Sequence, residues 1–192
     1  MFFSMSSAHE RKKDPLQVRR NLMDCAARIS VEQGLTSVTI QAVAAAAGVT
    51  KGGLLHHFPG KRELIEAVFN DLLEKFDEWI DSLLADDPIE YGRFTRAYAN
   101  TVLLPAPKGQ TVSWNALSVS MITDPDLRTL WHDWYTTRMK QHKHTDSDPV
   151  LQLIRYAADG IWLADGIGAN SPKNRKELRA LITAMTHQTK HS

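Results

Sequence analysis

Residues 39–61 read TIQAVAAAAGVTKGGLLHHFPGK, and this stretch determines the fold of the N-terminal part of the chain. Ile40, Val43 and Ala44 stand at positions i, i+3 and i+4, which is the spacing of one apolar helix face. Thr39 precedes them as an N-cap residue, whose hydroxyl can accept a hydrogen bond from a free backbone N–H. The pattern therefore predicts a short helix that begins after Thr39 and buries one face.

A second short helix follows after a tight turn. Gly48 stands where the first helix must end with a positive φ angle, which glycine adopts without strain. Thr50 is a second N-cap residue, the helix after it covers residues 51–58, and Pro59 ends it. Two short helices joined by such a turn predict a helix-turn-helix, whose second helix can enter the major groove of DNA.

The same stretch, together with the start of the helix after it, resembles the DNA-binding segment of the tetracycline-repressor (TetR) family of bacterial regulators. The residues that carry the resemblance are Thr39, Ile40, Val43, Ala44, Ala47, Gly48, Val49, Lys51, Gly52, Leu54, His57, Phe58, Lys61, Leu64 and Ile65. The resemblance implies an all-α protein with a helix-turn-helix head and a helical body that binds a small-molecule effector and forms a homodimer. It also implies a cytoplasmic transcription regulator that is not an enzyme and needs no cofactor.

Eight residues are candidates for contact with double-stranded DNA, because long side chains reach base edges or phosphates and small ones let the helix come close. The resemblance matches Thr39, Lys51, His56 and Lys61 to family positions that meet DNA, mostly at phosphates. Two glycines inside the second helix each cost about 1 kcal/mol relative to alanine, a cost that close approach to DNA would explain. The candidates are Thr39, Thr50, Lys51, Gly52, Gly53, Leu55, His56 and Lys61.

Leu55 departs from the family pattern, which often has a tyrosine that contacts the DNA backbone. Leucine has no hydrogen-bond donor but can contact a thymine methyl group, so we expect a different operator preference. His57 and Phe58 are expected to pack inside the head. Arg19 and Arg20, near the start of the first long helix, could either meet phosphates or stay solvated, and the sequence leaves both readings open.

The charges are unevenly divided along the chain. The formal net charge is +1, but residues 1–62 contain nine Lys/Arg against four Asp/Glu, and residues 63–192 contain fourteen against eighteen. A basic head on an acidic body suits contact of one end with a polyanion. No apolar run reaches the length of about 18 residues that a membrane helix needs, so no membrane partner is expected. The single Cys25 excludes an internal disulfide and is expected in the core, a redox switch being the other reading.

Helical spacing and the positions of Pro, Gly and Asp divide the chain into about nine helices, and no stretch alternates as a strand. We expect residues 1–60 to form the DNA-binding head, with a disordered tail over 1–14, and residues 61–192 to form the ligand-binding and dimerisation body. The predicted helices cover residues 15–33, 40–47, 51–58, 61–84, 89–104, 109–122, 124–143, 147–168 and 173–189.

The last two helices are expected to form the homodimer interface, as they do in the family that the chain resembles. Small residues on one face of the penultimate helix allow another helix to approach closely, and a protein that reads a palindrome needs a two-fold partner. Packing of the same faces within one chain is the alternative. The predicted interface residues are Leu153, Ala157, Gly160, Ala164, Ile167, Leu178, Ile182 and Met185.

Aromatic residues are concentrated in the body, where four of the five Trp residues lie beyond the long helix. They could line an apolar cavity for a flat or cationic small molecule, with Asp159 and Asp165 as counter-ions. An aromatic-rich, filled core is the alternative, and it would suit a regulator that needs no ligand. The predicted ligand-binding residues are Phe94, Tyr98, Trp114, Met121, Trp131, Trp134, Trp162 and Asp165.

No catalytic or metal site is predicted. His56 and His57 are adjacent in a helix and point apart, and His142 and His144 lie on different sides of a helix end. No catalytic triad spacing or phosphate-binding loop is present. We therefore expect a repressor that a small apolar, aromatic or cationic ligand releases from a palindromic operator. A ligand-independent DNA-binding regulator is the competing reading, and an α-helical enzyme or interaction protein is a more distant one.

Overall fold

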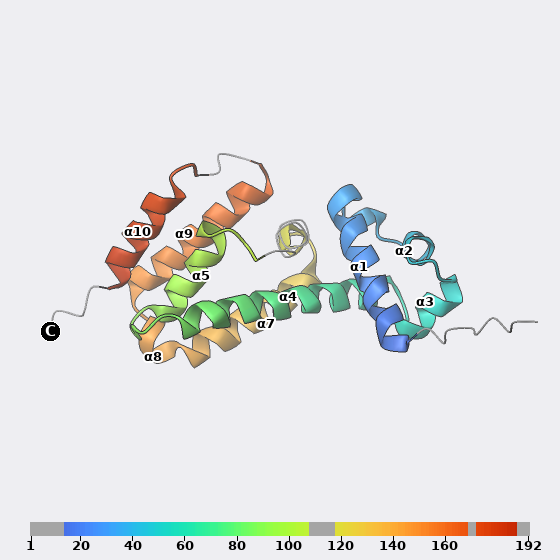
Figure 1. The fold of residues 1–192 in the computed structure, drawn as a ribbon, viewed down its shortest axis with the longest axis horizontal. Coiled ribbons are helices and arrows are strands. Elements are labelled where there is room, and N and C mark those ends of the chain that lie inside the picture. The colour runs from blue at the N-terminus through green and yellow to red at the C-terminus, as the bar shows by residue number, and fades with distance from the viewer. Residues whose placement is uncertain (1–13, 108–117, 169–171, 188–192) are drawn as a thin grey trace, which may run out of the picture.

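The computed structural model describes residues 14–107, 118–168 and 172–187, and one long helix, α4, runs from an N-terminal head into a larger body (Figure 1). The head contains α1 (Pro15–Gln33), the 3₁₀ turn η1 (Leu35–Ser37), α2 (Ile40–Ala46), α3 (Lys51–His57) and the start of α4 (Lys61–Ala85). The body adds α5 (Arg93–Leu103), α7 (Pro125–Gln141), α8 (Lys143–Asp146), α9 (Pro149–Gly166) and α10 (Arg175–Thr186). All regular structure in the described ranges is helical, which confirms the all-α prediction.

The predicted caps of the helix-turn-helix are present. The hydroxyl oxygen of Thr39 accepts a hydrogen bond from the Ala42 N–H at 3.1 Å, and that of Thr50 accepts one from the Gly53 N–H at 3.0 Å. Gly48 has a φ of 65°, in the left-handed region that favours glycine. The two N-caps and the glycine therefore fix where α2 ends and α3 begins, as the sequence predicts.

Several predicted boundaries are wrong, because long-range contacts decide them. The helix predicted from residue 89 begins only at Arg93, since Gly92 has a φ of 70° and donates its N–H to the Thr145 carbonyl at 2.9 Å. The helix predicted over 124–143 ends at Gln141 and is followed by the one-turn α8, where a loop was expected.

Two further predictions concern residues at the edges of the described ranges. The tail predicted over residues 1–14 lies outside these ranges except for Asp14, which is ordered and caps α1 by accepting the Leu16 N–H at 3.0 Å. The helix predicted over 109–122 lies mostly outside the described residues.

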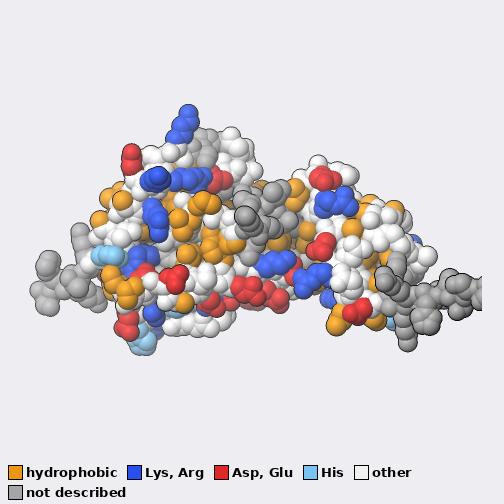
Figure 2. All heavy atoms as spheres, viewed as in Figure 1, with side chains coloured by type: hydrophobic (Ala, Val, Ile, Leu, Met, Phe, Trp, Pro, Cys, Tyr) orange, Lys and Arg blue, Asp and Glu red, His pale blue; other side chains and the backbone are white. Residues whose placement is uncertain are grey.

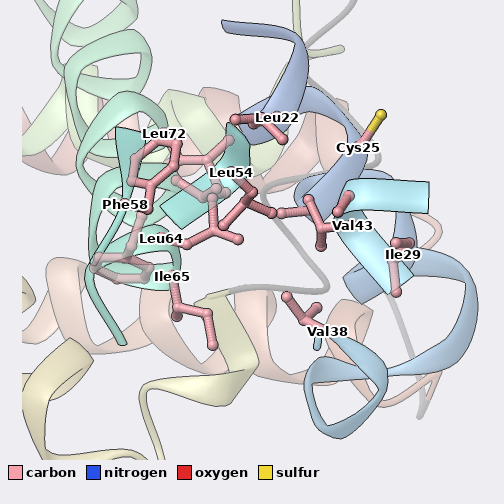
Figure 3. Close-up of a cluster of buried hydrophobic side chains, with 14 of the residues drawn as sticks. Leu22, Cys25, Ile29, Val38, Val43, Leu54, Phe58, Leu64, Ile65 and Leu72 are labelled. Atoms are coloured by element: carbon pink, nitrogen blue, oxygen red, sulfur yellow. The ribbon is translucent and has the colours of Figure 1, made fainter. Parts of the chain in front are cut away.

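The head core forms where α1, α2, α3 and α4 meet (Figure 3). Leu22, Leu54 and Leu64 come from three different helices, and each is fully buried. Cys25 is buried in the same cluster as a free thiol, which confirms its predicted place in the core. Burying a leucine side chain contributes about 1.5–3 kcal/mol, so these residues hold the short α2 and α3, which have little stability of their own.

The second half of α4 belongs to the body. Phe76 and Ile80 are buried in the body core with residues of α5 and α9, and Arg138 of α7 holds α7 to α4. The Arg138 guanidinium donates to Asp77 and to Asp81, each at 2.6 Å. Because one continuous helix contributes to both cores, the head cannot move without moving the near end of α4.

A buried arginine holds the start of α5 to the neighbouring segments. Arg96 is 4% exposed and makes an ion pair with Asp87 at 2.6 Å. It also donates to the backbone carbonyls of Tyr91 at 2.7 Å, Ile89 at 2.5 Å and Thr186 at 3.2 Å. Burial by itself would raise the pKa of the Asp87 carboxyl, but the hydrogen bonds from Arg96 and from the Ile89 N–H, together with the positive charge of Arg96, outweigh it, and the pKa is lowered.

Replacing this arginine should destabilise the body. Arg96→Met removes the cation that pairs with Asp87 and the donor to three backbone carbonyls, so the free energy of unfolding should fall by about 3–5 kcal/mol. Urea unfolding followed by circular dichroism measures this change. Arg128→Met, at an exposed site on α7, is the control and should change stability by less than about 0.5 kcal/mol. Equal stability of the two variants would contradict the role of the Arg96 network.

Candidate nucleic-acid interface and ligand cavity

Helix α3 buries one side in the head and exposes the other. Leu54 and Phe58 are buried in the head core, whereas Lys51, Gly52 and His56 are exposed. Leu55 is 36% exposed, so a large apolar side chain lies at the outer surface of this helix. The exposed side of α3 therefore carries four of the eight residues that the sequence predicts to contact DNA, and Phe58 is inside the head as expected.

The two threonines among the predicted DNA contacts also cap helices. Thr39 and Thr50 each use their hydroxyl oxygen to cap a helix while the residue itself stays exposed. The hydroxyl hydrogen is not needed for capping and can still be donated to a phosphate. Their contact with DNA stays a prediction.

Arg19 and Arg20, for which the sequence left phosphate contact and solvation open, both have partners within the protein. Arg19 donates to the carbonyl of His57, the last residue of α3, at 2.9 Å, and its guanidinium lies 4.1 Å from the centre of the Phe58 ring. Arg20 pairs with Asp71 of α4 at 2.5 Å. Arg19 therefore fixes the C-terminal end of α3, and Arg20 fixes α1 to α4.

The cations at the start of α4 also have partners in the protein. Arg62 lies 2.7 Å from the Glu66 carboxylate and 3.2 Å from that of Asp126 in α7, and these groups raise the pKa of Arg62. Arg62 is therefore paired within the protein. Lys61 lies near the carbonyls of Leu35 and Thr36 at 3.5 and 3.4 Å, and it is exposed, so a phosphate could still draw it away.

The body contains a cavity of about 760 Å³ between α4, α5, α9 and α10. On the face seen in Figure 2, hydrophobic side chains gather in the middle of the body, and Lys and Arg side chains border them. The cavity volume lies in the range of small-molecule sites, which are mostly apolar with a few polar groups. Its lining residues include Phe76, Trp79, Tyr98, Met121, Trp131, Ala158, Asp159, Trp162 and Asp165.

Five of the eight predicted ligand residues line this cavity, namely Tyr98, Met121, Trp131, Trp162 and Asp165. Phe94 does not, because it is fully buried and stacks on His142 with ring centres 4.8 Å apart. Trp134 does not either, because its indole N–H donates to Asp77 at 2.7 Å and holds the ring between α4 and α7. Trp114 lies outside the described residues.

The two carboxylates of the cavity wall have different environments. Asp165 makes two hydrogen bonds of 2.7 Å with Arg175 and is therefore paired within the protein. Asp159 accepts a hydrogen bond from the Tyr98 hydroxyl at 2.5 Å. Burial raises the pKa of the Asp159 carboxyl, although this hydrogen bond and the charge of Arg155 act to lower it. Burial also raises the pKa of the Tyr98 hydroxyl well above its usual range.

Sequence reasoning missed the contribution of α4 and α10 to this wall. Phe76 and Trp79 continue the apolar stripe of α4, and their periodicity indicates burial without saying that they face a cavity. Lys75, Lys176 and Arg179 have charged side chains that a periodic pattern assigns to the solvent, yet they border the cavity. No signal in the linear sequence distinguishes a core wall from a cavity wall.

The predicted dimer residues separate into two groups. On α9, Leu153 is 62% exposed and Ile167, just after the helix, is 60% exposed, while Ala157 and Gly160 are exposed between them and Ala164 is half-buried. On α10, by contrast, Leu178, Ile182 and Met185 pack against the body core of their own chain. The exposed apolar residue of α10 is Leu181. The α9 face is therefore exposed in the single chain, whereas these α10 residues are half-buried within it, and the dimer interface stays a prediction.

Within the described ranges, no group of three or more His, Cys, Asp or Glu side chains is placed to hold a metal ion. In the same ranges, no helix combines the length and hydropathy that crossing a membrane requires.

Comparison with known proteins agrees with this geometry. Residues 22–68 match the family described as "Bacterial regulatory proteins, tetR family", and residues 92–187 match "Tetracyclin repressor-like, C-terminal domain". The chain is 35% identical over 157 residues to the HTH-type transcriptional repressor KstR2 of Rhodococcus jostii (strain RHA1), covering 76% of this chain and 77% of that protein.

Solved structures share the fold. A crystal structure of SCO7518 from Streptomyces coelicolor A3(2), described as a transcriptional regulator, has a TM-score of 0.69 at 21% identity and covers 90% of this chain and 99% of that one. The multidrug binding protein EbrR complexed with malachite green has a TM-score of 0.69 at 20% identity and covers 88% of this chain and 98% of that one.

The glycines of α3 allow a test of close approach to DNA. A Cβ added at Gly52 would meet its nearest neighbour, the Thr50 hydroxyl, at 4.0 Å, so the fold has room for alanine. Gly52→Ala should raise the free energy of unfolding by up to about 1 kcal/mol, because alanine favours the helix. The same variant should bind a duplex from its own promoter region more weakly, because the methyl group keeps the backbone from the groove.

Urea unfolding and fluorescence anisotropy of the labelled duplex measure the two effects. Asn70→Ala, exposed in the middle of α4, is the control: it should also gain stability but leave DNA affinity unchanged. If Gly52→Ala binds the duplex as tightly as the wild type, the glycine does not serve close approach.

Proposed function

The chain belongs to the tetracycline-repressor (TetR) family of transcriptional regulators, and we propose that it acts as a homodimer which a small apolar or aromatic ligand releases from a palindromic operator. Its DNA-binding, helix-turn-helix head and helical body are those of a transcriptional repressor and not of an enzyme. The observation that carries the ligand-release proposal is the cavity of about 760 Å³, because one of its walls is α4, whose first turns belong to the head core.

The operator would be read from the exposed side of α3. Lys51 and His56 are long enough to reach bases or phosphates, and Gly52 lets the helix approach. Leu55 would supply an apolar contact such as a thymine methyl, where relatives often have tyrosine. Thr39, Thr50, Gly53 and Lys61 would complete the contact with the DNA backbone.

A two-fold partner would cover the exposed face of α9. Leu153, Tyr156, Leu163 and Ile167 are between 38% and 62% exposed, and contiguous apolar surface of this kind is typical of an interface. Leu181 of α10 is 56% exposed and would join it. Such a dimer would place its two α3 helices for two half-sites that are about one helical turn of DNA apart, or a multiple of it.

The chemistry of the cavity wall limits the chemical class of the ligand. Its aromatic lining suits a flat apolar or aromatic body. The wall also contains two lysines and two arginines against two aspartates, of which Asp165 is paired with Arg175. This balance weighs against the positively charged ligand that the sequence suggested, and the proposal therefore keeps only the apolar or aromatic body.

The ligand-independent alternative requires a filled body core, and the size of the cavity weighs against it. We also propose that the protein works in the bacterial cytoplasm, because its target is chromosomal DNA. Release would then be a shift between two orientations of α4, one of which spaces the two α3 helices to match the operator.

Filling the cavity should separate DNA binding from ligand response. Compounds that quench the Trp fluorescence of the wild type should weaken its operator binding by about tenfold or more. Thr101→Trp places a large ring on the cavity wall, so it should bind the operator with near wild-type affinity but lose this response. Anisotropy of labelled operator measures both, with Thr129→Trp at an exposed site of α7 as the control that keeps the response. A Thr101→Trp variant that responds like the wild type would contradict the proposal.

Charging the α9 face should abolish the dimer. Leu153→Arg places a charge in the proposed apolar interface, where an unpaired charge is costly, so the protein should become monomeric in light scattering. Its operator affinity should then fall steeply, because each half-site is bound alone. Leu16→Arg changes a 76% exposed leucine on α1 and should leave the dimer intact. A Leu153→Arg protein that remains a dimer would show that another surface forms the interface.

A further inference from the structure

Asp71 of α4 is shared between the head and the body. One carboxylate oxygen lies 2.5 Å from the Arg20 guanidinium of α1, and the other lies 2.6 Å from the Lys75 ammonium. The Asp71 side chain is 17% exposed, whereas Arg20 is 53% exposed and Lys75 is 40% exposed. One partly buried acceptor thus holds two cations, and a change at either cation alters the interaction with the other.

Lys75 also forms part of the cavity wall. A second hollow of about 430 Å³ lies on the other side, between α1 and α4, and Asp71 lines it. Leu72 and Lys75 line both spaces, so they separate the cavity from the junction of head and body. Figure 2 shows positive and negative side chains side by side along the segment that joins the two parts.

The head end of this chain of contacts leads to α3. Arg20 is adjacent in sequence to Arg19, which donates to the His57 carbonyl at the end of α3 and lies over the Phe58 ring. The two arginines therefore fasten α1 to α4 on one side and to α3 on the other. A change in the ion pair between Asp71 and Arg20 would be passed through α1 to the DNA-binding helix α3.

We propose that Arg20, Asp71 and Lys75 form a relay that reports occupancy of the cavity to the head, and that it senses an anionic group on the ligand. An anion bound at Lys75 competes with Asp71 for the ammonium, and Asp71 then interacts with Arg20 alone. The inference rests on the proposed function, because it assumes that the cavity is the effector site. It assigns the apolar or aromatic effector a carboxylate, sulfonate or phosphate group close to Lys75.

The competition predicts that removing Asp71 and removing Arg20 change the affinity for an anionic ligand in opposite directions. Removing Asp71 frees Lys75, so an anionic ligand should bind more tightly. Without Arg20, Asp71 interacts with Lys75 alone and competes more strongly with the ligand for the ammonium. The same ligand should therefore bind more weakly, although Arg20 is not part of the cavity wall. Exposed ion pairs change an equilibrium constant by up to about fivefold, and the effects should be about two- to fivefold.

Two fluorescent dyes of similar shape provide the test. 8-Anilino-1-naphthalenesulfonate has a sulfonate, and N-phenyl-1-naphthylamine is its neutral counterpart. The first dye should bind Asp71→Asn about two- to fivefold more tightly than the wild type, and Lys75→Met and Arg20→Met more weakly by similar factors. The neutral dye should bind the wild type, Asp71→Asn and Arg20→Met equally, because neither Asp71 nor Arg20 lines the cavity. Both dyes should lose their signal in Thr101→Trp, which shows that they occupy the cavity.

Glu74→Gln is the matched control, since it removes the same charge from the exposed side of α4 and should leave the affinity for both dyes unchanged. If Glu74→Gln tightens sulfonate binding as much as Asp71→Asn does, general charge explains the effect and the relay is wrong. Unchanged sulfonate binding in Arg20→Met would likewise overturn it, because the head would not be connected to the cavity.

Operator affinity measured with and without the sulfonate dye distinguishes this relay from the proposed function. If the dye weakens operator binding in the wild type and the effect is lost in Asp71→Asn, both proposals are supported. If the effect is equal in the wild type and Asp71→Asn, ligand release stands and the relay fails. If the dye affinities shift as predicted while operator binding ignores the dye, the coupling of Arg20, Asp71 and Lys75 to the bound anion stands, but it does not reach the operator and ligand release fails.

Discussion

The continuity of α4 is the constraint on which the rest of the structure depends. Leu64 and Phe69 of this helix are buried in the head core, and Ile80 is buried in the body core. An unbroken helix resists bending, because each turn is held to the next by backbone hydrogen bonds. The short α2 and α3 cannot bury enough apolar surface on their own, so they gain their stability by packing on α1 and α4. The surface that binds DNA is thus attached to the element that forms a wall of the cavity.

Arginines at the junctions of the helices are held by specific partners. Arg19 holds the end of α3, and Arg138 holds α7 to α4 through Asp77 and Asp81. A guanidinium can donate to several acceptors at fixed angles, and it therefore fixes the relative position of two helices more closely than apolar contacts do. The ion pairs that are exposed contribute little stability. That weakness makes them suitable for a junction that must change when a ligand binds.

The body combines a packed aromatic core with an open cavity, and the two share residues. Phe76 contacts the rings of Tyr98, Trp131 and Trp134, with ring centres 5.2–6.3 Å apart. Trp134 is fixed by Asp77, whereas Tyr98 and Trp131 face the cavity. The two readings of the aromatic residues that the sequence left open, cavity and filled core, therefore apply to different members of one cluster.

The sequence by itself determined the helix-turn-helix, because its signals are local: Thr39 and Thr50 cap helices within three residues, and Gly48 supplies a positive φ angle. Helical periodicity likewise gave the all-α class and the exposed α9 face. Only the tertiary structure decided where α5 begins, since Gly92 is held by Thr145, and which side chains line the cavity. It also decided the partners of Arg19, Arg20 and Arg62. These outcomes depend on residues far apart in the chain, and side-chain periodicity cannot tell a core wall from a cavity wall or a solvated cation from a paired one.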